Sequence, residues 1–334
     1  MPSDLVFVTY EDRPEAVVGV ALLARSLVEH NPGAKLLVYS PLSSVSDAVA
    51  GLETVEHIYT DEYVGSGWNV KPHVLLRALD IVETAIWLDT DIVVTGDLRT
   101  QIEKIDADAV AVSQDFRMPG EVGSHLRVKD FQLPPGRPLE YAVNGGSILV
   151  RRQHRALVEA WRDILKYEPY QQAQKAPRSE RIPSFYSDQE ALWAILASAP
   201  FADTPVFFFM TGRDVIFHCG ANGYHVMHRL RNLFHDRSKF VHMLGRYKPW
   251  SFEEKPSVFS APHDYLNLVC FELSPFHKAA QPFKSQVGDP AWLEIRTIPA
   301  RIFNALALGN VALRGLPLAA GAWLLSAFGR RAPL

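Results

Sequence analysis

The chain has 334 residues and a formal net charge of −3, with 48% hydrophobic and 21% charged residues. This composition is that of a globular protein with a sizeable core, in one large domain or two average ones. The near-neutral charge argues against nucleic acid as the main partner. Two cysteines are too few for a disulfide framework, and the amino end carries no basic stretch followed by a long apolar run. A cytoplasmic protein without a secretory signal is therefore expected.

The first part of the chain alternates between apolar runs and helical patterns. Residues 5–9 form a continuous apolar run, which predicts a buried strand. A helix is predicted to begin near Pro14, with Asp12 as a possible cap. Residues 35–39 predict the next strand. A strand–helix–strand beginning favours an α/β fold with parallel strand pairs.

The alternation continues through the middle of the chain. Further strands are predicted at 85–88, 109–112, 147–150, 205–210 and 239–243, and further helices at 74–82, 154–165 and 187–196. Two polar stretches, 116–141 and 171–183, are predicted to be long loops, the first of them a candidate lid. We expect an α/β domain over residues 1–255 and a helical extension over residues 256–334.

An Asp-Thr-Asp segment follows the predicted strand at 85–88. Ligands of open α/β sheets bind beyond the carboxyl ends of the strands, and carboxylates are ligands that hard divalent cations prefer. Asp89 and Asp91 could therefore hold a metal that stabilises a departing diphosphate. The pattern alone is weak, and a plain strand-end turn is an equal alternative. Asp106 and Asp108 repeat it ahead of a strand, where it is typical of a solvated turn.

The segment 239–250 contains a histidine near the end of another predicted strand, 239–243. His242 offers a neutral nitrogen ligand to a first-row metal. Gly245 lets the backbone come close to a phosphate, and Lys248 supplies a point charge for it. Taken singly, His242 fits a core histidine at least as well, and the Lys-Pro-Trp run fits an ordinary surface turn.

Two further segments, 144–146 and 187–190, are polar. Asn-Gly-Gly ahead of the strand at 147–150 is typical of a turn. Ser187 with Glu190 three residues on fits a helix N-cap and capping box. The functional alternative is that both segments supply hydrogen-bond partners to sugar hydroxyls at the carboxyl end of the sheet.

Taken together in this order, four segments resemble the glycogenin-like, family 8 group of retaining glycosyltransferases. They are Asp89-Thr90-Asp91 after its apolar strand, Asn144-Gly145-Gly146, Asp188-Gln189, and the run from His242 to Trp250. The last is specific, because it meets every fixed position of the family pattern His-x-x-Gly-x-x-Lys-Pro-Trp. The resemblance covers residues 5–252 and does not extend to the carboxyl end.

The resemblance implies a GT-A fold, which is an α/β catalytic domain around a mixed, mostly parallel central sheet. It also implies a UDP-sugar donor and manganese, or magnesium, as the metal. Carried over, the metal ligands would be Asp89, Asp91 and His242, and the catalytic pair Asp188 and Gln189. The donor would contact Thr9, Tyr10, Lys71, Asn144, Gly146, Gly245 and Lys248. The run after the first strand, Tyr-Glu-Asp-Arg at 10–13, departs from the family pattern.

The implied function is transfer of a hexose from a UDP-sugar to a glycan or glycolipid with retention of configuration. A double displacement needs a nucleophile beneath the anomeric carbon, and Asp188 and Gln189, about 100° apart on a helix, cannot both lie there. A front-face transfer is favoured, with Gln189 stabilising the oxocarbenium-like state, because an amide is a poor nucleophile. A non-catalytic nucleotide-sugar binder and a sugar nucleotidyltransferase remain alternatives, although the glycine-free run 11–14 counts against the latter.

The carboxyl end is apolar and basic. From residue 298 onward it has no acidic residue, and Arg301, Arg314, Arg330 and Arg331 interrupt the apolar side chains. Its longest charge-free run, 315–329, is short for a spanning helix. A core helix would explain the pattern. An interfacial segment whose arginines meet anionic lipid fits it better, and would bring the protein to a lipid-linked acceptor on the inner face of a membrane.

Overall fold

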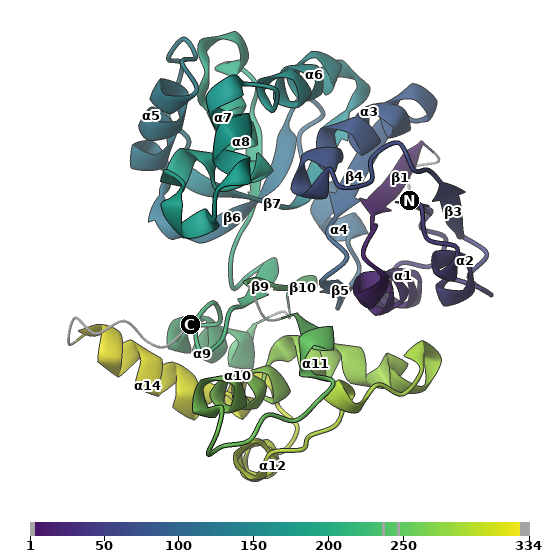
Figure 1. Ribbon diagram of the computed structural model, residues 1–334, viewed down its shortest axis with the longest axis vertical. Coiled ribbons are helices and arrows are strands. Elements are labelled where there is room, and N and C mark those ends of the chain that lie inside the picture. Colours follow the sequence, from purple (N-terminus) through teal and green to yellow (C-terminus); the bar gives the residue numbers. More distant parts are fainter. Residues whose placement is uncertain (1–3, 236–237, 246–247, 328–334) are drawn as a thin grey trace.

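The computed structural model describes residues 4–235, 238–245 and 248–327. Its centre is a seven-stranded sheet in the order β3-β2-β1-β4-β7-β6-β8, next to a three-stranded sheet in the order β5-β10-β9 (Figure 1). The strands are β1 (Leu5–Tyr10), β2 (Leu36–Ser40), β3 (Val55–Tyr59), β4 (Thr84–Leu88), β5 (Ile92–Val94), β6 (Val110–Pro119), β7 (Tyr141–Arg151), β8 (Val206–Phe209), β9 (Val215–His218) and β10 (Phe240–Met243). In the large sheet only β7 runs antiparallel to its neighbours, which confirms a mixed, mostly parallel sheet.

Helices cover both faces of the large sheet. Those of the first two-thirds of the chain are α1 (Val17–His30), α2 (Ser44–Ala48), α3 (Lys71–Ile81), α4 (Arg99–Ile102), α5 (Gly120–Asp130), α6 (Arg155–Ile164), α7 (Glu168–Lys175), α8 (Asp188–Ala197) and α9 (Val226–Phe234). Strand β1 is buried at every position because its side chains alternate between two cores. Val6 and Val8 face the core under α3, α6 and α8, whereas Leu5 and Phe7 face the core under α1 and α2.

The carboxyl end folds into a layer of helices against the small sheet (Figure 1). These helices are α10 (Pro262–Glu272), α11 (Pro275–Ala280), α12 (Ile298–Leu306), α13 (Val311–Arg314) and α14 (Leu316–Ala327). Phe271 and Phe276 share a core with Val93 of β5 and with Val241 and Met243 of β10. The extension is therefore helical, as predicted, and it packs directly behind the strands of the small sheet.

Arg314 does not reach outward to lipid, contrary to the expectation. Its side chain is fully buried, and its guanidinium donates a hydrogen bond of 2.7 Å to the carbonyl of Glu272. The neighbouring Arg301 is exposed, whereas Phe328, Arg330 and Arg331 lie outside the described residues. In the described part of the chain, no helix combines the length and the apolar character needed to cross a membrane.

Two segments predicted to be loops contain helices. α5 lies within 116–141, and α7 overlaps 171–183. In α5, Gly123 lies against the ring of Trp193, and the buried Arg127 forms an ion pair with Glu190. These long-range contacts stabilise a helix whose glycines and charges resemble a loop in the sequence.

Two predicted helix caps are also wrong. The side chain of Ser187 makes no capping hydrogen bond in the described structure, and Glu190 pairs with Arg127 instead of closing a capping box. Asp12 does not cap the turn at Pro14, because its carboxylate accepts a hydrogen bond of 3.0 Å from the backbone of Gly65.

Candidate active site

The predicted site residues converge where β1, β4 and β10 end and where α8 begins. A cavity of about 390 Å³ opens there. Its lining includes Tyr10, Lys71, Asp89, Asp91, Asn144, Asp188, Gln189, His242, Gly245 and Lys248. Of the predicted residues, Thr9 and Gly146 are absent from the lining. Thr9 is buried in β1, on the opposite side of the strand from Tyr10.

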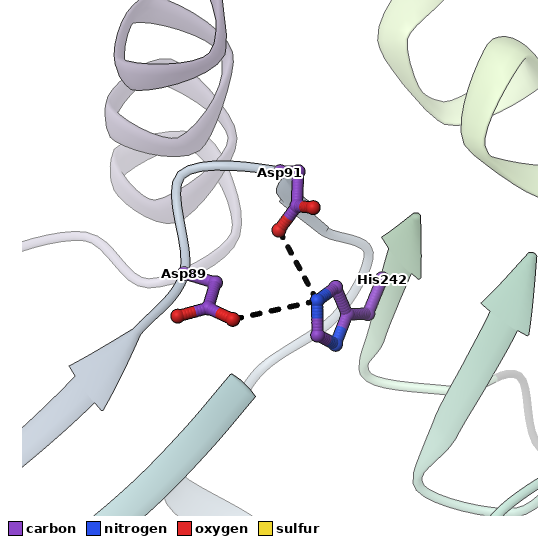
Figure 2. A group of neighbouring side chains, drawn as sticks. All are labelled: Asp89, Asp91 and His242. Atoms are coloured by element: carbon purple, nitrogen blue, oxygen red, sulfur yellow. Dashed lines mark ion pairs between the residues drawn. The ribbon is translucent and has the colours of Figure 1, made fainter. Parts of the chain in front are cut away.

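Two aspartates and a histidine form a compact group within the cavity (Figure 2). Asp89 and Asp91 lie on the short connection from β4 to β5, and β10 pairs antiparallel with β5, with His242 opposite Ile92. This register brings Nε2 of His242 to 3.1 Å from Asp91 Oδ1 and 3.6 Å from Asp89 Oδ2. The three potential ligand atoms all lie within 4.8 Å of one another.

This donor set fits a divalent first-row cation. Carboxylate oxygens and an imidazole nitrogen suit manganese, and the carboxylates also suit magnesium. Asp91 is held ionised, because Lys248 and His242 lower its pKa well below the usual range in spite of burial, which alone would raise it. By contrast, Asp106 and Asp108 lie in an exposed turn, as predicted.

Gly146 has a role that the turn interpretation missed. The segment 144–146 lies inside β7, not ahead of a strand. A Cβ at position 146 would lie 2.1 Å from Cε1 and 2.5 Å from Nδ1 of His242, so only glycine leaves room for the imidazole. The carbonyl of Gly146 also accepts a 2.9 Å hydrogen bond from the backbone N–H of Asp89. Gly146 therefore helps to position two of the three candidate ligands, His242 and Asp89, without lining the cavity itself.

Two lysines neutralise the carboxylates of the site. Nζ of Lys71 lies 3.1 Å from Asp89, 3.6 Å from Asp188 and 2.9 Å from the carbonyl of Gly145. Burial alone would lower the pKa of Lys71, but the carboxylates of Asp188 and Asp89 outweigh it and raise that pKa. Lys248 contacts Asp91 and donates to the carbonyl of Met243 at 2.9 Å.

Asp188 and Gln189 begin α8 and differ in their surroundings. Burial raises the pKa of Asp188 to about 6, despite the opposing charge of Lys71. The amide oxygen of Gln189 faces the amide of Asn144 and the N–H of Gly145, both at 3.4 Å. Asn144 in turn accepts a 3.0 Å hydrogen bond from the N–H of Gly146. The start of α8 is thereby tied to the strand that carries the glycines.

Glu11, Trp68 and Arg178 line the cavity but were not predicted from the sequence as site residues. Glu11 is buried and accepts hydrogen bonds from Thr90 at 2.7 Å and from the guanidinium of Arg13 at 2.7 and 2.8 Å, so it fixes the residue between the two aspartates. Its signal is an acidic residue directly after β1. Trp68 and Arg178 also line the cavity. In the sequence, the only feature that marks Trp68 is its position next to a glycine. No pattern in the neighbouring residues marks Arg178 as a site residue.

The run from His242 to Trp250 is described only in part. Arg246 and Tyr247 lie outside the described residues. Gly245 has a φ of +97°, a left-handed conformation that favours glycine. Trp250 packs against Gly19 of α1, where a Cβ would lie 2.9 Å from the indole ring. The close approach of α1 to this loop therefore depends on a glycine in the middle of a helix.

No family model matches the sequence, and no curated protein matches it either. The apo structure of the bifunctional glycosyltransferase WbbM aligns with a TM-score of 0.55 and 15% identity, over 88% of this chain and 51% of that chain, so this chain spans about half of its length. The galactosyltransferase LgtC, in complex with donor and acceptor sugar analogs, aligns with a TM-score of 0.50 and 15% identity, over 85% and 96% of the two chains. The molecule therefore has the GT-A fold that the resemblance in the sequence implied, followed by the C-terminal helical extension.

Proposed function

We propose that this protein is a metal-dependent glycosyltransferase that moves a hexose from a UDP-sugar to a glycan or glycolipid with retention of configuration. The observation that carries the proposal is the group of Asp89, Asp91 and His242 in a cavity bounded by Lys71 and Lys248. The GT-A fold supports it, since the two aligned structures belong to glycosyltransferases.

In this proposal Asp89, Asp91 and His242 hold manganese or magnesium. The bound metal would supply Lewis-acid stabilisation of the negative charge that develops on the departing diphosphate. Lys248 and the backbone at Gly245 bind the diphosphate, and Tyr10 lies towards the nucleoside. Lys71, which already contacts Asp89 and Asp188, lies on the sugar side of the diphosphate.

The retaining mechanism in this proposal depends on the residues that would lie beneath the donor sugar. Asp188 is buried and paired with Lys71, and Gln189 presents a neutral amide, so neither is a good nucleophile. We infer a front-face transfer. The bond between the anomeric carbon and the phosphate oxygen breaks, and a bond to the acceptor oxygen forms on the same face. The acceptor proton passes to the departing phosphate oxygen, while the Gln189 amide stabilises the oxocarbenium-like state.

The test of this function is donor turnover and the stereochemistry of the product. With manganese present, we expect hydrolysis of one UDP-hexose among several offered, and an α-linked first product by proton NMR from an α-linked donor. Gln189→Ala is expected to lower kcat much more than it raises the donor KM, because its contact strengthens in the transition state. A β-linked product would contradict retention, and weaker donor binding at unchanged kcat would make Gln189 a substrate contact only.

The exposed apolar side chains of the C-terminal layer support a peripheral contact with the cytoplasmic face of a membrane. Ile302 and Leu306 on α12 are 53% and 72% exposed, and Trp323 on α14 is 63% exposed. The exposed Arg301 lies on the same helix as the first two. Apolar groups can enter the headgroup boundary while a nearby cation meets anionic lipid. A lipid-linked acceptor would then lie within reach.

Binding to vesicles tests this contact. The full chain should sediment with liposomes containing anionic lipid at low salt, and Leu306→Ser with Trp323→Ser should weaken binding several-fold. Ile81→Ser is the matched control, because Ile81 is 63% exposed at the end of α3, away from the C-terminal layer (Figure 1). Equal sedimentation of both variants, or none by the full chain, would contradict the membrane contact. Truncation at residue 290 is unsuitable, since it removes the buried Trp292 and Arg314.

A further inference from the structure

One wall of the cavity is not used by the proposed donor chemistry. Beyond Asp188 and Gln189, the lining continues to Trp68 and Arg178. Trp68 lies on the short 3-10 helix Gly67–Val70 that leads into α3, and Arg178 lies on the 3-10 helix Arg178–Glu180 that follows α7. Neither segment carries a candidate metal ligand or a diphosphate contact.

Arg178 differs from the other cations of the cavity. Lys71, Lys248 and Arg13 each form an ion pair with a carboxylate of the lining. Within residues 4–235, 238–245 and 248–327, the structure gives Arg178 no ion pair. Its guanidinium lies over the ring of Tyr186 at 5.0 Å from the centroid. Stacking on an aromatic face orients a guanidinium and leaves its N–H groups available to an anion.

The segment that carries Arg178 is held in place by its neighbours. Arg181 donates to Gln174 Oε1 at 2.6 Å, to the carbonyl of Ala176 at 3.0 Å and to that of Tyr186 at 3.2 Å. Arg181 therefore uses its donors inside the segment, whereas Arg178, three residues earlier, is exposed and lines the cavity.

The Trp68 segment is tied to α7, the helix that precedes the Arg178 segment. Asn69 accepts a 2.7 Å hydrogen bond from the hydroxyl of Tyr170, which is fully buried in α7. Trp68, next to this anchor, is 49% exposed and lines the cavity. An aromatic ring held at a cavity mouth offers a flat apolar face to the C–H groups of a sugar ring.

We propose that Trp68 and Arg178 form the acceptor subsite, and that the acceptor is a sugar bearing an anionic substituent, a phosphate or a carboxylate. This inference rests on the proposed transferase function. The donor diphosphate has its own partners in the metal and Lys248, so the charge of Arg178 is left for the second substrate. Arg178 would pair with the anionic group, and Trp68 would stack against the ring that carries it.

The test compares three acceptors in the metal-loaded enzyme: a methyl hexoside, its 6-phosphate, and the corresponding methyl hexuronide. The wild-type enzyme should show a higher kcat/KM for one or both anionic acceptors than for the neutral methyl hexoside. Comparison of the 6-phosphate with the hexuronide then distinguishes a phosphate from a carboxylate. Arg178→Gln should raise the KM for the preferred acceptor by about 10- to 100-fold, the range for a charge-assisted hydrogen bond, and Arg178→Lys should restore part of it. Trp68→Ala should raise the KM for charged and neutral acceptors alike. Lys175→Gln, a cation of the same region outside the cavity lining, is the control.

Several results would overturn the subsite. They are equal use of neutral and anionic acceptors by the wild type, an unchanged acceptor preference in Arg178→Gln, or a loss of donor hydrolysis in that variant that would assign Arg178 to the donor. Absence of any UDP-sugar hydrolysis by the wild type contradicts the transferase function instead. In that case calorimetric titration with the 6-phosphate glycoside and the hexuronide still decides the subsite, because an anion site at Arg178 binds one of them and the Arg178→Gln variant does not.

Discussion

Replacing Asp91 with asparagine is expected to lower turnover of the UDP-hexose donor by roughly 100-fold or more. The substitution removes one of three candidate ligand atoms that lie within 4.8 Å of one another. It also leaves Lys248 without the carboxylate that it contacts. Asp89→Asn and His242→Ala should have effects of the same order. Initial rates measured over a manganese titration should show a raised metal requirement, and EDTA should abolish wild-type activity.

The second Asp-x-Asp sequence provides the matched control. Asp106→Asn and Asp108→Asn change the same residue type at the same spacing in an exposed turn, and they should leave turnover within about twofold of the wild type. Thermal melts of all variants exclude unfolding as the cause of a lost rate. Full activity in EDTA, or in Asp91→Asn, would refute the metal site.

Gly146→Ala should lower metal affinity and turnover by about 10- to 100-fold, although Gly146 does not line the cavity. The new methyl group would lie 2.1 Å from Cε1 of His242. Because this distance is far shorter than a non-bonded contact between two carbon atoms, the imidazole must move. Overpacking of this kind also costs about 1–3 kcal/mol of folding free energy. The measurements are a manganese titration of activity and the urea unfolding midpoint.

Alanine substitutions at two other glycines serve as comparisons for Gly146→Ala. At Gly145 a Cβ would lie 3.2 Å from Cβ of Gln189, so Gly145→Ala should reduce turnover more than metal affinity. At Gly321 on α14 nothing lies within 4 Å of the added Cβ, and alanine should be neutral or slightly stabilising. If Gly146→Ala kept the wild-type metal affinity, the imidazole would have an alternative position, and the positioning role of Gly146 would be wrong.

The parts of the site that local sequence could predict are those that follow apolar strands. Asp89 and Asp91 follow the buried strand β4, and His242 lies on the buried strand β10. The pairing of β10 with β5 then brings His242 to the two aspartates. The mixed sheet and the helical carboxyl end follow from the same patterns. These predictions succeed because strand burial and the position of a strand end are local properties.

The parts that could not be predicted depend on contacts between distant residues. Gly146 resembles a turn residue until His242 is seen to occupy the space of its missing side chain. Glu190 fits a capping box, but its carboxylate is taken by Arg127, which also turns an apparent loop into α5. Arg178 carries no signal at all, because its role depends on where α7 and its following turn place it. Tertiary contacts override local preference at each of these positions.

The four-residue strand β10 (Phe240–Met243) connects the candidate metal site to the C-terminal helices. Val241 and Met243 pack with the C-terminal helices, whereas His242 between them faces Asp89 and Asp91. The N–H of Met243 also donates to the carbonyl of Asp91 at 3.1 Å. A side-chain change in the C-terminal core that shifts β10 by a fraction of an ångström therefore moves two ligands at once. Substitutions in this layer are therefore constrained by the geometry of the candidate metal site, and a manganese titration of activity should detect a displaced helix layer before the protein loses its fold.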